Sequence, residues 1–302
     1  MLAEFRVFLD GAPLEALLDD ADTCAAALEG FGRHLYSLLP RRHRQDYVAA
    51  ILAVVDARRS LRRNLACAWD FAAAWRHEEP GVNNLAMPAV VLRAFLTVAL
   101  HWEWLLFALM CAIGFAGILR PSEFLFCTRS LVILPRDVRG VWYRCWLRIP
   151  RPKSRWAGAR RQLARVDEWW VTMMAQKLLG DLPPSQRIWP ASPASFRKRW
   201  DAVARALRMP VTQGSGVTPA SLRGGGATAF YELTEDADRL RRRARWATLQ
   251  SAEIYIQEVA PYEFLANLSP NAREHIFRVA DSFEAQMLKF LGPEAQRVGC
   301  IP

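Results

Sequence analysis

Apolar residues recur at helical spacing through most of the chain, and this periodicity predicts two groups of helices. The first group has three helices, at 24–39, 41–63 and 65–76. The segment HEEPGVNN at 77–84 follows them and is rich in turn-forming residues. We therefore expect a helical N-terminal domain at 1–84 and a larger domain at 85–302. Residues 1–20 carry no clear pattern.

In the larger domain, a short alternating pattern interrupts the helical ones. Helices are predicted at 88–100, 167–180, 193–208, 219–233, 236–247, 250–259 and 271–291. Between the first two lies a series of alternating apolar positions, Val141, Tyr143, Cys145, Leu147 and Ile149. Alternation of this kind is typical of a strand with one buried face, and residues 162–166 are expected to return beside it after a basic turn. These patterns predict a mainly α fold with one small antiparallel β-sheet.

The most apolar segment, WEWLLFALMCAIGFAGIL at 102–119, has a single charge at Glu103. Its 18 residues reach the lower limit for a helix that crosses a membrane. Gly114 and Gly117 lie within it, and it leads directly into Arg120. We favour a buried core helix, with a membrane span as the alternative.

The net charge of the chain says more about its binding partner than its composition does. The chain has 302 residues, 52% of them hydrophobic, which is enough for sizeable cores. Its formal net charge of +10 favours a polyanionic partner such as nucleic acid, or an anionic membrane surface. Only four of the 40 basic residues are lysines, so arginine, whose planar guanidinium suits phosphate oxygens, supplies the other 36.

Two further features narrow the class of protein. None of the six cysteines forms a CxxC pair or lies near a histidine at zinc-ligand spacing, so no metal site is expected. The N-terminal sequence MLAEFRVFLDG has an early acid and lacks the pattern of a signal peptide. We expect an intracellular protein with reduced cysteines.

One candidate for anion binding is Arg120. Pro121 after it fits the first position of a helix, and Glu123 then falls in the first turn, where a carboxylate is favoured. Backbone N–H groups at a helix N-terminus attract anions, so Arg120 is well placed to join them. The alternative is an arginine that caps its own loop.

A second candidate is Arg223, which is predicted in the second turn of a helix that Thr218 and Pro219 can begin. Three glycines follow at 224–226, although each costs about 1 kcal/mol relative to alanine inside a helix. A chain tolerates them where its backbone approaches another group closely. That group is either a phosphate backbone or a tightly packed neighbouring helix.

Trp246 and Tyr255 follow a cluster of five arginines at 239–245. On one continuous helix, their nine-residue spacing would place them on opposite faces. If both line one site, the chain must break between them, and the break is expected near 248–251. Taken singly, each is more often a core residue than a site residue.

The two arginine segments resemble motifs of the tyrosine recombinases, the phage-integrase family, in their catalytic domain. The family's first arginine lies in a G-L-R-x-x-E pattern, which L-R-P-S-E matches at 119–123. Its second lies in an H-x-L-R pattern, which A-S-L-R matches at 220–223. The resemblance covers roughly residues 85–260, and the N-terminal domain is similar only in being a basic helical domain of suitable size.

The remaining motifs occur in the family's order. In the family, a His or Trp that directly follows a glycine lies nine residues before the tyrosine. Trp246, which follows Arg245, lies nine residues before Tyr255. The lysine of the family's β-hairpin is best matched by Lys153 on the basic turn. The resemblance therefore implies a catalytic set of five residues, Arg120, Lys153, Arg223, Trp246 and Tyr255.

It also implies a mechanism. Arg120 and Arg223 would hold the nonbridging oxygens of the scissile phosphate and stabilise its transition state. Tyr255 would attack phosphorus to give a 3′-phosphotyrosyl link, while Lys153 protonates the leaving 5′-oxygen. Trp246 would donate its indole N–H to the phosphate or pack the site. No cofactor or metal is implied, because the covalent link conserves the bond energy.

The implied partner is double-stranded DNA, bound by a homo-tetramer across two sites, and no membrane is implied. Backbone contacts are expected from exposed arginines, which add affinity but little sequence information. The candidates are Arg58, Arg62, Arg151, Arg155 and Arg242. The helix at 271–291 is expected to pack either on its own domain or in a neighbouring subunit.

The chain departs from the family at two positions. Ala220 stands where His or Lys is usual, and Gly224 stands where another His is common. Alanine cannot transfer a proton, and the loss of a general base costs about 10²–10⁴ in rate. The sequence therefore leaves two hypotheses, a site-specific recombinase or integrase and a weak or inactive DNA-binding protein of the same fold. A type IB topoisomerase shares the chemistry, but no feature favours it separately.

Overall fold

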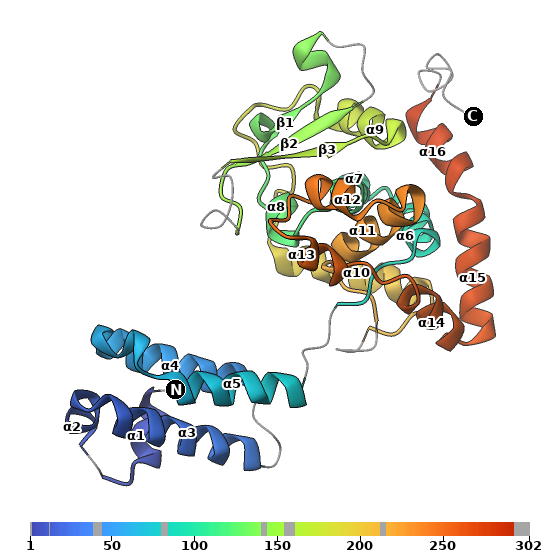
Figure 1. Ribbon diagram of the computed structural model, residues 1–302. Helices are drawn as coiled ribbons and strands as arrows, with labels where there is room; N and C mark the ends of the chain where they lie inside the picture. Colours follow the sequence, from blue (N-terminus) through green and yellow to red (C-terminus); the bar gives the residue numbers. More distant parts are fainter. Residues whose placement is uncertain are drawn as a thin grey trace. The chain divides into compact units, whose positions relative to one another are not determined.

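The computed structural model describes residues 2–11, 13–38, 44–79, 84–139, 144–153, 161–211 and 216–292. The chain divides into two compact units, Met1–Val82 and Asn83–Pro302, each with its own hydrophobic core. Figure 1 shows a smaller unit made of helices and a larger one that contains the sheet. Most of the described chain is helical and its sheet is small and antiparallel, so the predicted fold class is confirmed.

All regular secondary structure in the described part of the first unit is helical. Its α-helices are α1 (Leu2–Phe8), α2 (Leu14–Asp19), α3 (Ala21–Ser37), α4 (Arg44–Ala57) and α5 (Ala66–Glu78). Tyr47, Ile51 and Val54, which recur at helical spacing along α4, are fully buried. The helix predicted at 41–63 is wrong at its end, because α4 stops at Ala57 and a 3₁₀ helix occupies Arg59–Arg63.

Eleven α-helices of the second unit fall within its described ranges. They are α6 (Ala89–His101), α7 (Leu105–Ala116), α8 (Pro121–Leu125), α9 (Trp169–Leu179), α10 (Pro193–Ala206), α11 (Ser221–Thr234), α12 (Ala237–Arg243), α13 (Leu249–Glu253), α14 (Ala260–Asn267), α15 (Pro270–Asp281) and α16 (Phe283–Leu291). Short 3₁₀ helices occupy Arg129–Leu131 and Pro135–Val138. Helix α7 is buried almost throughout, and α6, α9 and α11 pack around it.

The apolar segment at 102–119 forms α7 over only 12 residues, because the chain turns before Leu105 and again after Ala116. Its side chains belong to the core of the second unit, so the predicted buried helix is confirmed. In the part of the chain that the structure describes, every helix is too short or too polar to cross a membrane.

The sheet has the order β1–β2–β3, with all neighbours antiparallel. Its strands are β1 (Val132–Ile133), β2 (Cys145–Ile149) and β3 (Gln162–Val166). Alternate residues Cys145, Leu147 and Ile149 are buried, which confirms the predicted strand over its described part and its return partner. The positions 141 and 143 lie outside the described residues.

The C-terminal helix predicted at 271–291 is two helices, because α15 ends at Asp281 and α16 begins at Phe283. They run along one side of the second unit in Figure 1, where α15 packs on α6 and α16 packs on α6 and α9. Ile276 on α15 and Met287 on α16 are buried in the hydrophobic core of their own unit.

Three glycines set α11 closely against two neighbouring segments. A Cβ added at Gly225 or Gly226 would lie well under 3.0 Å from the carbonyl oxygen of Met87 or of Phe115, respectively. At Gly224 the nearest atom would be the Ala86 Cα, 3.2 Å away. The close neighbour of these glycines is therefore the chain itself, at 86–87 and at the end of α7. This contact places the start of α11 beside the residues that follow α7.

Candidate active site

The carbonyl groups at the end of α7 are bound by arginines from distant parts of the chain. Arg223, on α11, donates from Nη1 to the Ile118 carbonyl at 2.8 Å. Arg245, after α12, donates to the Gly117 and Ile118 carbonyls, each at 3.1 Å. Cations are favoured at a helix C-terminus, where carbonyl groups lack partners within the helix. The end of α7 thus gathers two guanidinium groups.

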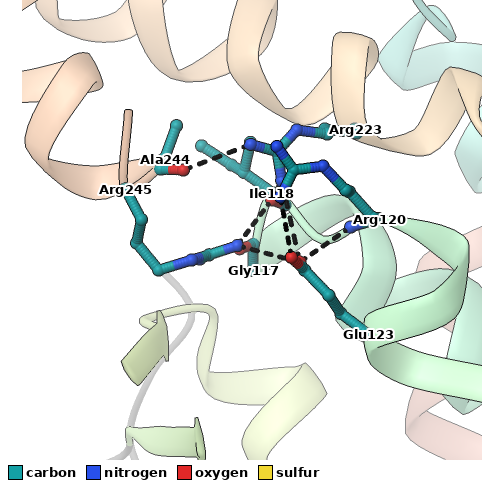
Figure 2. A network of polar contacts seen from close by, with 7 residues as sticks. All are labelled: Gly117, Ile118, Arg120, Glu123, Arg223, Ala244 and Arg245. Carbon is teal, nitrogen blue, oxygen red and sulfur yellow. Dashed lines mark hydrogen bonds and ion pairs between the residues drawn. The ribbon is translucent and has the colours of Figure 1, made fainter. Parts of the chain in front are cut away.

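Glu123 on α8 holds the arginines together (Figure 2). Its carboxylate accepts from the Arg120 backbone N–H and from Arg120 Nη1, each at 3.0 Å, and from Arg245 Nη2 at 3.1 Å. Arg223 Nη1 lies 3.7 Å from the same carboxylate, within ion-pair range. Three guanidinium groups therefore share one carboxylate, which leaves two positive charges in excess.

The excess charge is held in a poorly solvated place. The side chains of Arg223 and Arg245 are 4% and 8% exposed, whereas that of Arg120 is 26% exposed. Burial, together with repulsion from Arg120 and Arg245, lowers the pKa of Arg223 to about 10. Burial also lowers the pKa of Arg245 to about 10, against the attraction of Glu123. Both groups remain charged at neutral pH, and a bound anion would offset their repulsion.

Trp246 and Tyr255 stack on each other next to Arg223. Their ring centroids are 4.8 Å apart with planes 18° from parallel. The Arg223 Cζ atom lies 5.3 Å from the Trp246 ring centroid and 5.4 Å from that of Tyr255, at cation–π distance from both. Arg223 is thus the residue that connects the two rings to the Glu123 cluster.

A break in the helix brings the two rings together. Helix α12 ends at Arg243, Arg245 adopts a left-handed backbone with φ +62°, and α13 begins only at Leu249. The expected break is confirmed, and it begins a few residues earlier than predicted. Thr228 on α11 fixes the end of this segment, since its hydroxyl donates to the Tyr255 carbonyl at 3.1 Å.

Two buried donors at this place lack acceptors. Within the described residues, neither the Trp246 indole N–H nor the Arg223 Nε–H has a hydrogen-bond partner. An unsatisfied buried donor costs about 1–3 kcal/mol, so such groups are uncommon away from binding sites. The arrangement offers N–H donors and positive charge to an anion, beside a tyrosine ring.

An ion-pair network fixes the chain ahead of this site. Asp167, just after β3, pairs with Arg144, Arg165 and Arg243 at 2.8, 2.9 and 2.7 Å. Arg243 also donates to the Ala116 carbonyl at 3.3 Å. The network therefore joins the sheet, α12 and the end of α7, and it anchors the segment that carries Arg245 and Trp246.

The structure brings four of the five predicted catalytic residues together, namely Arg120, Arg223, Trp246 and Tyr255. Lys153 is exposed on the segment that follows β2. Within the described ranges, no recorded contact joins it to the other four. Its catalytic role stays a prediction.

The start of α11 differs from the predicted one. Thr218 and Pro219 lie in a turn, and the helix begins at Ser221 with Ala220 as its N-cap. The Ser221 hydroxyl is buried and accepts from the Thr218 backbone N–H at 2.9 Å. It is engaged in the turn, and Ala220 offers no polar group at the position one turn before Arg223.

Arg245 is a site residue that the sequence motifs did not single out. It belongs to the cluster at 239–245, and in the resemblance it occupies the glycine position before Trp246. An arginine where the resemblance places glycine is a third departure from the family pattern, and it is the signal that marks Arg245. The described residues contain no group of three or more His, Cys, Asp or Glu side chains that could hold a metal ion.

The predicted DNA-contacting arginines of the first unit are both exposed. Arg58 forms an ion pair with Asp19, and Arg62 lies in the 3₁₀ helix that follows α4. An exposed ion pair contributes little to stability, so Arg58 can exchange its partner for a phosphate at small cost. Their contact with DNA stays a prediction.

The predicted DNA-contacting arginines of the second unit lie near the sheet and on α12. Arg151 is exposed after β2, and Arg155 lies outside the described residues. Arg242 is exposed and pairs with Asp238 at 3.1 Å on the same helix. Their role also stays a prediction.

Comparisons with known proteins give matches only at the level of structure. The XerH site-specific recombinase bound to its difH substrate, in a pre-cleavage complex, has a TM-score of 0.45 and 12% identity, over 73% of this chain and 70% of its own. The same recombinase in a post-cleavage complex with palindromic difH has a TM-score of 0.45 and 12% identity, over 78% and 75%. The XerA recombinase has a TM-score of 0.43 and 12% identity, over 91% and 90%. The sequence matches no protein-family model and no curated protein.

Proposed function

We propose that the chain is a DNA strand transferase of the tyrosine-recombinase type, in which Tyr255 is the nucleophile. The observation that supports this most is the position of Arg223. It shares Glu123 with Arg120 and also lies against the stacked rings of Trp246 and Tyr255. Positive charge, buried N–H donors and a tyrosine thus converge, as the attack on a phosphodiester requires.

In the proposed reaction, Arg120 and Arg223 hold the nonbridging oxygens of the scissile phosphate. The Tyr255 oxygen forms a bond to phosphorus as the bond to the 5′-oxygen breaks, and the phenolic proton passes to solvent. Lys153 supplies a proton to the leaving 5′-oxygen. Trp246 donates its indole N–H to the phosphate as negative charge develops. The reverse steps rejoin the strands, so the protein needs no external energy source.

The proposed substrate is double-stranded DNA, and the proposed assembly is a tetramer of this chain across two duplexes. The exposed arginines Arg58, Arg62, Arg151, Arg155 and Arg242 would bind the backbone. Because such contacts release counterions, affinity would fall steeply with salt. Sedimentation of the protein with and without cleavable duplex tests the assembly, and a complex that never exceeds one chain per duplex would contradict it.

A second candidate function is binding without cleavage. Ala220 favours it, because the side chain one turn before Arg223 cannot accept or donate a proton. The two functions share the anion site and differ only in whether Tyr255 becomes covalently attached to DNA.

A suicide-substrate experiment separates the two. Duplexes with randomised arms are each nicked so that the short fragment that carries the freed 5′-hydroxyl diffuses away. They are incubated with the protein and denatured in SDS. The proposed function predicts a protein–DNA adduct that survives SDS and whose sequencing reveals the preferred site. Tyr255→Phe should abolish it. Tyr262→Phe is a matched control, because Tyr262 lies seven residues further on and is 64% exposed. No adduct from the wild-type protein, or one that persists in Tyr255→Phe, would refute the proposal.

A further inference from the structure

Arg245 is a charged residue in a backbone conformation that L-residues rarely adopt. Its φ of +62° lies in the left-handed region, which only glycine enters at no cost. Its side chain is nevertheless buried and donates to two carbonyl groups and to Glu123. The contacts of the guanidinium must therefore offset both the strained backbone and the burial of a charge.

Arg245 and Arg223 approach the same carboxylate oxygen. Glu123 Oε2 accepts from Arg245 Nη2 at 3.1 Å and from the Arg120 backbone N–H at 3.0 Å. Arg223 Nη1 lies 3.7 Å from this oxygen, too far for a hydrogen bond, and donates to the Ile118 carbonyl instead. Arg223 Nη2 donates to the Ala244 carbonyl at 3.3 Å, and the Nε–H has no partner within the described residues. Because Oε2 already has two donors, Arg223 is left without a direct hydrogen bond to Glu123.

We infer that Arg245 is a positioning residue, which occupies Glu123 and so keeps Arg223 out of a hydrogen-bonded pair with that carboxylate. The charge of Arg223 and its unpartnered Nε–H then remain available for a phosphate group. The inference rests on the proposed function only for identifying that phosphate as part of DNA. Arg245 acts through Glu123 and needs no contact with the ligand. It is the residue that prevents a hydrogen-bonded Arg223–Glu123 pair from forming in this buried place.

Two consequences follow when Arg245 is removed. Glu123 Oε2 then loses a charged donor in a place with little water, and the nearest replacement is Arg223. Arg223 then moves from 3.7 Å to hydrogen-bond distance of Glu123, which lowers its availability to an anion. The excess positive charge around Glu123 also falls from two to one.

The left-handed backbone allows a clean substitution. Arg245→Gly removes the side chain and leaves a residue that accepts this φ without strain. Arg245→Lys keeps the charge and loses the planar pair of donors. Arg139→Gly is a matched control, because Arg139 is also left-handed, with φ +47°, but is exposed and makes none of the Glu123 contacts. Thermal unfolding of each variant is the check that it folds.

The decisive variant is the double substitution Arg245→Gly with Glu123→Gln. If Glu123 captures Arg223 once Arg245 is gone, neutralising Glu123 releases it, so the double variant should bind phosphate more tightly than Arg245→Gly alone. If Arg245 only supports the fold, the loss of a second partner should weaken binding further. The two interpretations therefore predict opposite signs.

Binding of inorganic phosphate to the full chain is measured by isothermal titration calorimetry. We expect Arg245→Gly to weaken binding about tenfold, Arg245→Lys to recover part of the loss, and Arg139→Gly to leave it unchanged. No phosphate binding by the wild-type chain, unchanged binding in Arg245→Gly, or a double variant that binds phosphate no more tightly than Arg245→Gly would overturn the inference.

The DNA-adduct assay distinguishes failure of this inference from failure of the proposed function. Phosphate results as expected, without any wild-type adduct, would refute strand transfer alone, and equal adduct formation and phosphate affinity in Arg245→Gly would refute the inference alone.

Discussion

Replacing Gly226 by alanine should destabilise the second unit through a contact with α7. A Cβ at this position would lie well under 3.0 Å from the Phe115 carbonyl oxygen, which is backbone and cannot rotate away. Gly224→Ala is the matched control on the same helix, because its Cβ would meet the Ala86 Cα at 3.2 Å, a distance that small shifts can relieve. The two substitutions are chemically identical, so their difference reports the close approach.

The magnitude follows from two opposing effects. Overpacking a close contact costs about 1–3 kcal/mol, and more where the backbone has to move. Alanine in place of glycine inside a helix returns about 1 kcal/mol. For Gly226→Ala, α11 and α7 have to separate, so we expect a net loss of about 2 kcal/mol in the free energy of unfolding. For Gly224→Ala the two effects nearly cancel, and we expect a change within about 0.5 kcal/mol.

Urea unfolding followed by tryptophan fluorescence and by helical ellipticity measures both variants. The strain at Phe115 should also reach the site, since Gly117 and Ile118 follow it and bind the arginines. Gly226→Ala should therefore weaken phosphate binding as well as folding, while Gly224→Ala should spare both. Equal unfolding free energies for the two variants would show that the close approach does not limit the packing of α11.

Three further predictions concern single groups. Trp246→Phe keeps the stacked ring and removes the buried N–H, so the Tyr255 adduct with DNA should form about 100-fold more slowly with little loss of stability. An unchanged rate of adduct formation would exclude the indole as a donor. The pKa of Arg223 and of Arg245 is lowered to about 10, so these groups lose their protons at lower pH than free arginine. Phosphate affinity measured by calorimetry should therefore fall as pH rises through about 10. Burial raises the pKa of Glu168 above its ordinary value of 4.5, so above pH 4.5 the folded state binds more protons than the unfolded state. The free energy of unfolding should therefore fall as pH rises from 4.5 through the raised pKa. Glu168→Gln should reduce this pH dependence, measured by urea unfolding at several pH values.

Periodicity in the sequence predicted most helices because apolar stripes are a local property, but it could not place every helix end. The stripe formed by Ile276, Phe283 and Met287 continues across the break at Ser282, so two helices read as one. The helix predicted at 250–259 ends at Glu253, and the pattern of apolar residues does not mark that end. Pro261, near the start of α14, was the available signal for a new helix there.

The candidate site was predictable to the extent that its residues lie in recognisable local motifs. Arg120 and Arg223 stand beside predicted helix starts, and the spacing of Trp246 and Tyr255 required a break that the structure confirms. The role of Arg245 could not be predicted, because it depends on a left-handed backbone and on a carboxylate 122 positions away in the sequence. Competition for one oxygen is a property of the three-dimensional arrangement.

Ala220 gives the sharpest test of whether the chain retains useful catalysis. It caps α11 and is half-buried, three residues before Arg223, so a side chain at this position projects from the same face of the helix. Ala220→His would supply the proton-handling group that the resemblance leads us to expect. If the proposed chemistry is intact and limited by proton transfer, this variant should form the Tyr255 adduct at least 100-fold faster than the wild-type protein. Ala220→Asn, which adds a polar side chain with no group that titrates near neutral pH, is the control. An adduct from Ala220→His alone would identify the wild-type protein as a DNA binder that retains the architecture of a strand transferase, whereas equal rates for all three proteins would mean that Arg120 and Arg223 suffice without a base at this position.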